Sequence, residues 1–138
     1  MLTKRLLAKE LSVPRHPFIF FIPAFLWLSL VTVLTLSPSH KIPQGLQEVN
    51  DKIIHAGIYF ITCGLIYLGF IRFNFKYPVA RKVLGGIVVL CILYGGAIEL
   101  LQHYLTASRK GDWYDFLANS AGVLISAITL RLFHRWNS

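Results

Sequence analysis

The chain has 138 residues, of which 55% are hydrophobic and only 14% are charged. Soluble domains carry roughly 25% charged residues, so this composition excludes an ordinary soluble globular domain. The formal net charge of +8 would suit a nucleic-acid-binding protein, but the basic residues stand in short blocks beside apolar stretches and not along one solvated face. We therefore expect a membrane protein with no nucleic-acid partner.

The first residues predict a short amphipathic segment. Four leucines between residues 2 and 11 alternate with Lys4, Arg5 and Lys9, a pattern typical of a helix that lies on an anionic membrane surface. Pro14 and Pro17 would end this helix, since proline does not fit a helix interior.

Four long apolar stretches follow in chain order. A transmembrane helix needs about 20 mostly apolar residues to cross the hydrocarbon layer. The predicted spans cover residues 18–36, 53–71, 83–105 and 116–133. The loops between them are short, so sequential spans should be neighbours. We expect an all-α membrane protein, a single domain over residues 1–138 that forms a four-transmembrane-helix bundle.

The basic residues predict how this bundle is oriented. Lys and Arg resist translocation, so the side of the membrane that carries more of them is the cytoplasmic side. Ten of the 14 basic residues fall before the first span, between the second and third, or at the end of the fourth. The other four are Lys41, Lys52, Arg109 and Lys110. Both termini are therefore expected in the cytoplasm, in a multi-pass membrane protein.

Polar residues gather at the predicted outer ends of the second, third and fourth spans. Asp51 and His55 are four residues apart, as are Asp115 and Asn119, so each pair shares one helix face. An ionisable group inside the hydrocarbon layer costs at least about 2.5 kcal/mol. Glu99, in the third span, must therefore face a partner or a wet cavity.

The expected partners of Glu99 are Arg109, His55 and Gln102. Small residues in the third and fourth spans would let these two helices approach closely. They are Gly95, Gly96, Ala118, Gly122 and Ser126.

Four strings in order make the sequence similar to the VanZ-like family of small bacterial membrane proteins. They are SLVTVLTLSP, DKIIHAGIYF, YGGAIELLQ and SRKGDWYDFLANSAG, and together they extend over about residues 29–122. The resemblance implies that the family's polar positions match Asp51, Lys52, His55, Glu99, Gln102, Arg109, Asp112, Asp115 and Asn119. It also implies a location in the bacterial cytoplasmic (inner) membrane, a role in the cell envelope and a role in resistance to the glycopeptide teicoplanin, but it supplies no reaction.

Each polar residue has a functional and a structural interpretation. His55, Glu99, Asp51 and Asp115 are the predicted catalytic residues, with His55 and Glu99 transferring protons. The structural alternatives are an N-terminal cap at Asp51 and a permanently paired Glu99.

The predicted substrate-binding residues are Arg109, Gln102, Asn119, Asp112 and Lys52. Arg109 would clamp a phosphate or carboxylate, or else pair with the neighbouring aspartates.

The acidic residues and His55 also supply ligand types suited to a metal, but no metal-binding motif spacing occurs and several cations compete for the carboxylates. No metal and no other cofactor are therefore expected. Tyr59, Tyr94, Tyr104, Trp113 and Tyr114 are interpreted as an aromatic belt at the membrane surface, with Trp113 and Tyr114 as alternatives for stacking on a sugar or peptide group.

Three functional classes remain open from the sequence. The first is an enzyme that acts on membrane lipids or a lipid-linked envelope precursor at the extracytoplasmic face. The second is a binding or accessory protein in which the polar residues only shape a pocket. The third is a small transporter, which is disfavoured because the charges gather at one surface and no inverted repeat occurs. A homo-oligomer is also left open.

Overall fold

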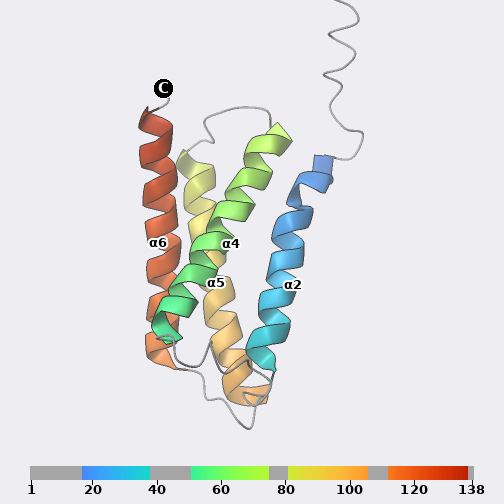
Figure 1. The fold of residues 1–138 in the computed structure, drawn as a ribbon, viewed down its shortest axis with the longest axis vertical. Helices are drawn as coiled ribbons and strands as arrows, with labels where there is room; N and C mark the ends of the chain where they lie inside the picture. Colours follow the sequence, from blue (N-terminus) through green and yellow to red (C-terminus); the bar gives the residue numbers. More distant parts are fainter. Residues whose placement is uncertain (1–16, 38–50, 75–80, 106–111, 137–138) are drawn as a thin grey trace, which may run out of the picture.

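The computed structural model describes residues 17–37, 51–74, 81–105 and 112–136, and these residues form helices only (Figure 1). The amphipathic segment expected between residues 2 and 11 lies outside the described residues, and so do Lys41, Arg109 and Lys110. The elements in chain order are η1 (Pro17–Phe21), α2 (Ile22–Leu36), α4 (Asp51–Asn74), α5 (Arg81–Leu105) and α6 (Trp113–Trp136).

The described part holds four helices long and apolar enough to cross a membrane. The first of them combines the 3₁₀ turn η1 with α2 and runs over Phe18–Leu36. These helices confirm the predicted all-α class and the predicted number of spans. They face outward with large apolar side chains such as Phe25, Leu93 and Leu132, which are exposed. Such a surface suits contact with lipid tails and not with water.

The helices extend beyond the predicted boundaries at their polar ends. For example, α4 begins at Asp51 and α6 begins at Trp113, a few residues before the apolar stretches used for the prediction. Hydropathy locates only the part of a helix in the hydrocarbon layer, whereas the helix itself continues into the headgroup region.

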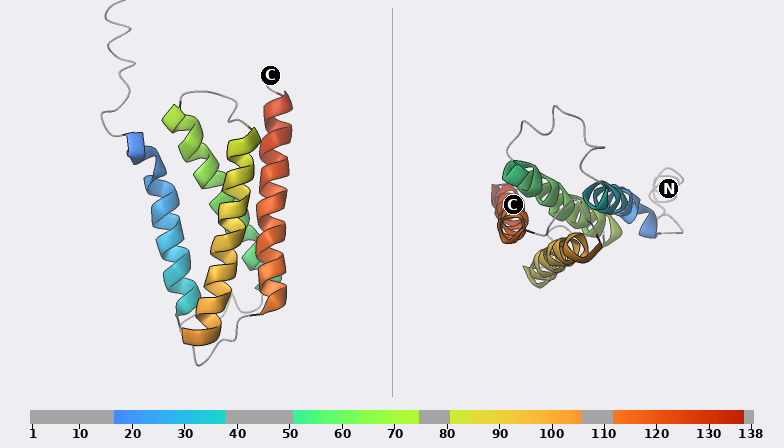
Figure 2. Two further views of the ribbon diagram at one scale, coloured as in Figure 1. Left: turned by 180° about the vertical axis from the view of Figure 1, so that it is seen from behind. Right: turned by 90° about the horizontal axis from the view of Figure 1, so that it is seen from below.

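α4 is the central helix of the bundle. It packs against η1, α2, α5 and α6, and its contact with α6 is the most extensive of these (Figure 2). Beside α4, α2 is held by a hydrogen bond from Trp27 Nε1 to Thr62 Oγ1 of 3.0 Å. The buried core between these helices includes Cys63, Cys91 and Val123. The other three membrane-spanning helices therefore all pack against α4.

Small residues bring α4 and α6 together. A Cβ atom added to Gly122 would lie 2.0 Å from the backbone oxygen of Ala56 in α4, so the two backbones touch there. The sequence predicted that Gly122 and Ser126 would let the third and fourth spans approach, but Gly122 packs against α4, the second span. Ser126 Oγ lies 3.9 Å from the Cβ position of Gly64, also in α4. Gly96 does face α6, against Phe116.

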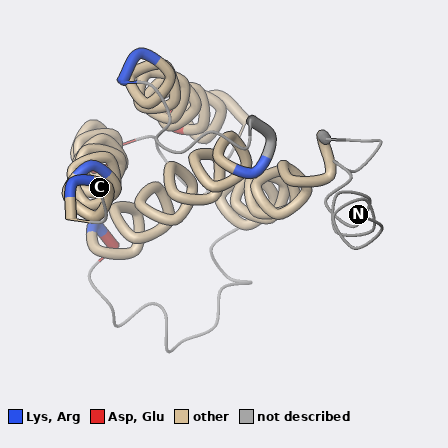
Figure 3. The backbone as a smooth tube through the Cα atoms, turned by 90° about the horizontal axis from the view of Figure 1, so that it is seen from above, with Lys and Arg blue, Asp and Glu red and all other residues tan. Residues whose placement is uncertain are grey.

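The two ends of the bundle differ in charge. At one end, five basic residues of the described part lie near the end of α4, the start of α5 and the end of α6 (Figure 3). They are Arg72, Arg81, Lys82, Arg131 and Arg135. We call this the basic end. At the opposite end, where α2 and α5 end and α4 and α6 begin, all four acidic residues of the described part are found. We call this the network end.

Replacing Gly122 by Ala should destabilise the bundle, because the added methyl group would clash with the α4 backbone. The clash can be relieved only if α4 and α6 move apart. We expect the free energy of unfolding to fall by about 1–3 kcal/mol, measured by thermal or denaturant unfolding of the purified protein in detergent. Gly57→Ala is the matched control, since a Cβ at Gly57 meets nothing within 4 Å. It should leave stability unchanged or raise it slightly through helix propensity. Equal stability of the two variants would contradict the close contact.

Candidate functional site

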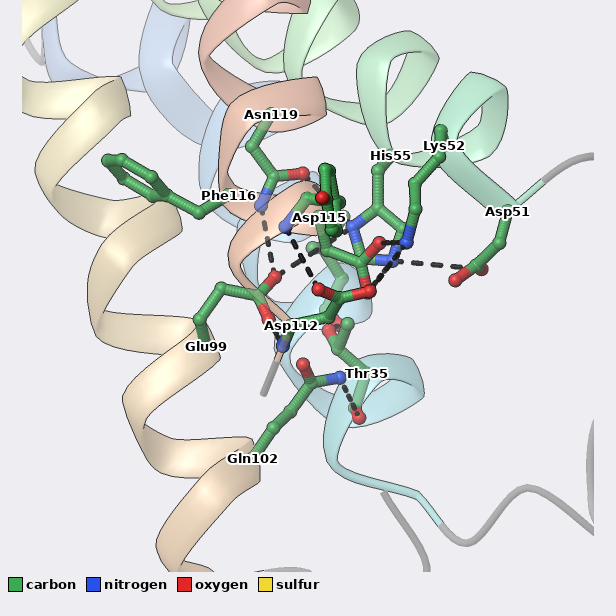
Figure 4. A network of polar contacts seen from close by, with 12 residues as sticks. Thr35, Asp51, Lys52, His55, Glu99, Gln102, Asp112, Asp115, Phe116 and Asn119 are labelled. Atoms are coloured by element: carbon green, nitrogen blue, oxygen red, sulfur yellow. Dashed lines mark hydrogen bonds and ion pairs between the residues drawn. The ribbon is translucent and has the colours of Figure 1, made fainter. Parts of the chain in front are cut away.

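The network end brings together polar side chains from three helices, and the end of α2 joins them (Figure 4). Asp51, Lys52 and His55 come from the first turns of α4, and Glu99 and Gln102 come from the last turns of α5. The remaining members precede or begin α6. They are Asp112, Asp115 and Asn119. The structure therefore brings together eight of the nine predicted site residues. The ninth, Arg109, lies outside the described residues.

Lys52 forms ion pairs with two aspartates of the α6 start. Its Nζ lies 2.9 Å from Asp112 Oδ2 and also contacts Asp115 Oδ1. The sequence left open whether these aspartates pair with Arg109, and in the structure Lys52 is a partner of both. The Lys52 ammonium holds the pKa of the Asp112 carboxyl below its ordinary value. Lys52 and Asp112, predicted to bind substrate, therefore also tie α4 to α6.

Asp112 also lies directly before the first residue of α6. Its Oδ1 accepts a hydrogen bond of 2.9 Å from the backbone N–H of Tyr114, and its backbone oxygen accepts from Asp115 N at 3.0 Å. An aspartate that accepts from an N–H of the first helical turn is an N-terminal cap. From the sequence, an N-terminal cap was the structural alternative for a different aspartate, Asp51, which lies in the first turn of α4.

A buried chain of hydrogen bonds links α4, α6 and α5. Asn119 Nδ2 donates to Glu99 Oε1 over 3.2 Å, and Asn119 Oδ1 pairs with His55 Nδ1 over 3.0 Å. The other carboxylate oxygen of Glu99 accepts from the backbone N–H of Asp112 over 3.2 Å. All three side chains are buried. Of the partners expected for Glu99, His55 does lie close, with Nδ1 4.0 Å from Oε1.

The first membrane-spanning helix contributes to the site through its backbone. Gln102 Nε2 donates a hydrogen bond of 2.9 Å to the backbone oxygen of Thr35. Thr35 is the second-last residue of α2, which ends at Leu36. The last carbonyl groups of a helix have no partner within it, so a buried amide side chain there fulfils a structural need. Thr35 was not among the predicted site residues, and only its position just before the Ser-Pro pair that ends the first span could have suggested it.

The aromatic belt expected from the sequence is partly wrong. Tyr104, Trp113 and Tyr114 are exposed near the network end, as a belt requires, but Tyr59 is buried with only 2% exposure. Its ring packs against Tyr94 with centroids 5.9 Å apart. Among the described side chains, the Tyr59 hydroxyl is a buried polar group without a hydrogen-bond partner. It lies one helical turn further into the bundle than His55.

A cavity of about 640 Å³ lies between α5 and α6 beside this network. Its wall is mostly apolar, with side chains such as Ile92, Leu93 and Phe116, but Glu99 and Asp112 also line it. Trp113 stacks on Phe116 with ring centroids 5.3 Å apart at its border. Glu99 is therefore reached from the cavity on one side and joined to His55 through Asn119 on the other.

Three side chains of the network end supply atoms suited to a metal ion. Asp51, His55 and Asp115 each present one ligand atom, and the three atoms lie within 4.8 Å of one another. Asp51 is the exposed member of this group. His55 Nε2 lies 3.8 Å from an oxygen of each aspartate, so a proton would pass between them only through a bridging water.

Replacing Asn119 by Ala should lower stability, because it leaves the Glu99 carboxylate and the His55 ring without their common partner in a buried position. We expect a loss of about 1–3 kcal/mol in the free energy of unfolding, measured by denaturant titration in detergent. Ser120→Ala is the control, since Ser120 Oγ donates only within its own helix, to Phe116 O. It should change stability by no more than about 0.5 kcal/mol. Equal effects of the two substitutions would contradict the bridging role of Asn119.

Comparison with known proteins agrees with this arrangement. The family model described as VanZ/LLP1 matches residues 16–134, nearly the whole chain and all the network residues. Searches of curated proteins and of solved structures gave no match. The four membrane-spanning helices, the acidic network at one end and this match support one conclusion, that the chain is a multi-pass membrane protein of the VanZ/LLP1 family.

Proposed function

We propose that the protein is an enzyme that uses acid/base chemistry on the head group of a membrane lipid or of a lipid-linked cell-envelope precursor. The observation that carries this proposal is the position of Glu99 on the wall of the cavity between α5 and α6. A hydrocarbon tail would occupy the apolar part of the cavity, which is bordered by exposed apolar residues such as Leu93 and Leu100. The head group would then lie next to the carboxylate.

Glu99 is the proposed general base in this reaction. Its side chain is only 9% exposed, and both of its oxygens accept hydrogen bonds, from Asn119 and from the Asp112 backbone. These bonds fix the carboxylate in one orientation, from which it would take a proton from water or from a substrate hydroxyl in the cavity. Positioned proton transfer contributes about 10²–10⁴-fold to a rate. Three ionisable side chains lie on the side of Glu99 that faces away from the cavity, and they would influence how readily it accepts a proton. They are His55, Asp51 and Asp115.

The proposed binding residues surround this base. Gln102 and Asn119 supply amide groups, Lys52 supplies an ammonium at the α4 start, and Arg109 follows the third span in the sequence. The ammonium and the guanidinium would contact an anionic head group through charge-assisted hydrogen bonds. The exposed Trp113 and Tyr114 rings are suited to stacking on a sugar or a peptide group.

We also propose an orientation and a cellular role. The positive-inside tendency assigns the basic end to the cytoplasm, with the network end at the extracytoplasmic face of the bacterial cytoplasmic membrane. Five basic residues of the described part at that end, against Lys52 alone at the other, support this orientation. Chemistry on the outer leaflet would alter the envelope, in line with a role in glycopeptide resistance, specifically to teicoplanin.

A second candidate function has support in the same contacts. Lys52 pairs with two aspartates, and the His55, Asn119 and Glu99 side chains bond one another. Polar groups that already have partners within the protein can serve only to shape a pocket. Such a pocket also suits a protein that binds and shields envelope lipids without changing them. The experiment below separates the two functions by asking for a chemical product.

We expect Glu99→Gln to abolish a lipid change that the wild type produces, because the amide keeps the shape of the side chain but cannot accept the proton. The measurement is a mass-spectrometric profile of lipids and lipid-linked wall precursors from cells with no protein, wild type or variant at matched membrane abundance. Arg131→Gln, at the exposed basic end, is the control and should match the wild type. A wild-type profile equal to that of cells without the protein would contradict enzymatic activity and favour lipid binding.

Ala97→Trp tests the cavity separately from the base. Ala97 lines the cavity and is exposed, so an indole there would fill the space proposed for the lipid tail. We expect the lipid change to slow by about tenfold or more, since the head group would no longer be held against Glu99. Ala121→Trp, exposed on α6 outside the cavity lining, should not slow it. Full activity of Ala97→Trp would show that the substrate does not use this cavity.

A further inference from the structure

Three ligand-type atoms converge at the start of α4 and α6. We propose that Asp51 Oδ1, His55 Nε2 and Asp115 Oδ2 bind a divalent metal ion (Figure 4). His55 Nε2 lies 3.8 Å from each of the two carboxylate oxygens, beyond hydrogen-bond distance. Metal–ligand bonds of about 2.0–2.2 Å put neighbouring ligand atoms roughly 3.0–3.4 Å apart. To complete the site, each of these two distances would shorten by less than about 1 Å. The two carboxylate oxygens, which lie within 4.8 Å of one another, would approach by up to about 1.8 Å.

The hydrogen bonds behind His55 prepare its Nε2 atom for a metal. The Glu99 carboxylate can only accept, so the amide nitrogen of Asn119 faces it and the amide oxygen faces His55. His55 Nδ1 must then be the donor in its pair with Asn119 Oδ1. In the neutral ring, the lone pair is consequently on Nε2, which points at the two aspartates.

This arrangement matches how metal-binding histidines are held in proteins. A ligating histidine almost always donates its second ring N–H to a carbonyl or carboxylate, which fixes the ring and its tautomer. Asn119 supplies that carbonyl oxygen here, and Glu99 in turn fixes Asn119. A lone pair directed at two carboxylate oxygens, with no hydrogen bond between them, is an unfavourable arrangement that a bound cation would resolve.

Lys52 does not occupy the proposed position. Its Nζ contacts Oδ1 of Asp115 and Oδ2 of Asp112, whereas the oxygen of Asp115 that faces His55 is Oδ2. The two oxygens of Asp115 thus serve different partners, and a metal ion could bind without displacing the ammonium.

The local charge also favours a cation. At the network end, the described residues include four carboxylates against one ammonium, Lys52, which gives a formal charge of −3 when His55 is neutral. The His55 side chain is 8% exposed and that of Asp115 is 12% exposed, so water screens these groups poorly. A divalent ion between them would remove most of the excess negative charge.

The ligand set identifies the class of metal. One imidazole with two carboxylates suits Mn²⁺ or Zn²⁺ better than Ca²⁺ or Mg²⁺, which take oxygen ligands. The Asp51 side chain is 59% exposed, so the site is open toward water. Three protein ligands leave positions for water or for an oxygen of an anionic head group. The site stands on its own contacts and does not require the acid/base role of Glu99.

The test uses the full-length protein, purified in detergent, treated with a chelator and titrated with Mn²⁺. Electron paramagnetic resonance of the free ion gives the affinity, and pulsed resonance of the bound ion reports nitrogen coupling from an imidazole. We expect one tight site per chain with ¹⁴N coupling, and competition by Zn²⁺. Absence of binding at millimolar Mn²⁺, or bound Mn²⁺ without nitrogen coupling, would overturn the proposal.

Two substitutions that remove the same charge distinguish a metal site from general attraction to an acidic surface. Asp51→Asn removes a proposed ligand from an exposed position, and it should weaken Mn²⁺ binding by about tenfold or more. Glu48→Gln removes one negative charge three residues before Asp51 in the sequence and changes no proposed ligand, and it should weaken binding less than threefold. Equal weakening by both variants would reject the site. Since the readout is binding, either result is independent of the lipid profile of Glu99→Gln.

Discussion

The contact between the backbones of α4 and α6 at Ala56 and Gly122 is the constraint on which the polar network depends. Both helices begin at the network end, so their close approach sets Asp51, Lys52 and His55 opposite the start of α6. Only at that separation do Lys52 and His55 reach Asp115 and Asn119. A side chain larger than hydrogen at Gly122 would push the helices apart along their length, and the hydrogen bonds between them would lengthen together.

The network satisfies structural and chemical requirements with the same atoms. Glu99 lies in a membrane-spanning helix, where an unpaired carboxylate is unfavourable. The two hydrogen bonds that it accepts stabilise the carboxylate there. The same bonds hold it in one orientation on the wall of the cavity between α5 and α6. Asp112 likewise caps α6, contacts Lys52 and lines the cavity. Loss of such a residue would therefore affect folding and function together, which is why matched controls are needed.

The site was predicted well in its members and less well in its contacts. The spacing of four residues in Asp51 and His55, and in Asp115 and Asn119, placed each pair on one helix face, and the structure brings these faces together. The contact of Lys52 with two aspartates, and that of Gln102 with the α2 backbone at Thr35, could not be derived from spacing. Tyr59 was assigned with the other aromatic residues to a belt at the membrane surface, whereas its side chain is buried in the core.

The sequence by itself determined the four membrane-spanning helices, the gathering of acidic residues at one end and the family, because hydropathy, periodicity and motif order are local properties of the chain. The tertiary structure decided which helices touch, which nitrogen of His55 faces the aspartates, and where the cavity opens. These depend on how the helices rotate and approach, which is set by side-chain packing at sites such as Gly122 and Gly95. Small residues were visible in the sequence, but which neighbour each of them admits follows only from the packed bundle.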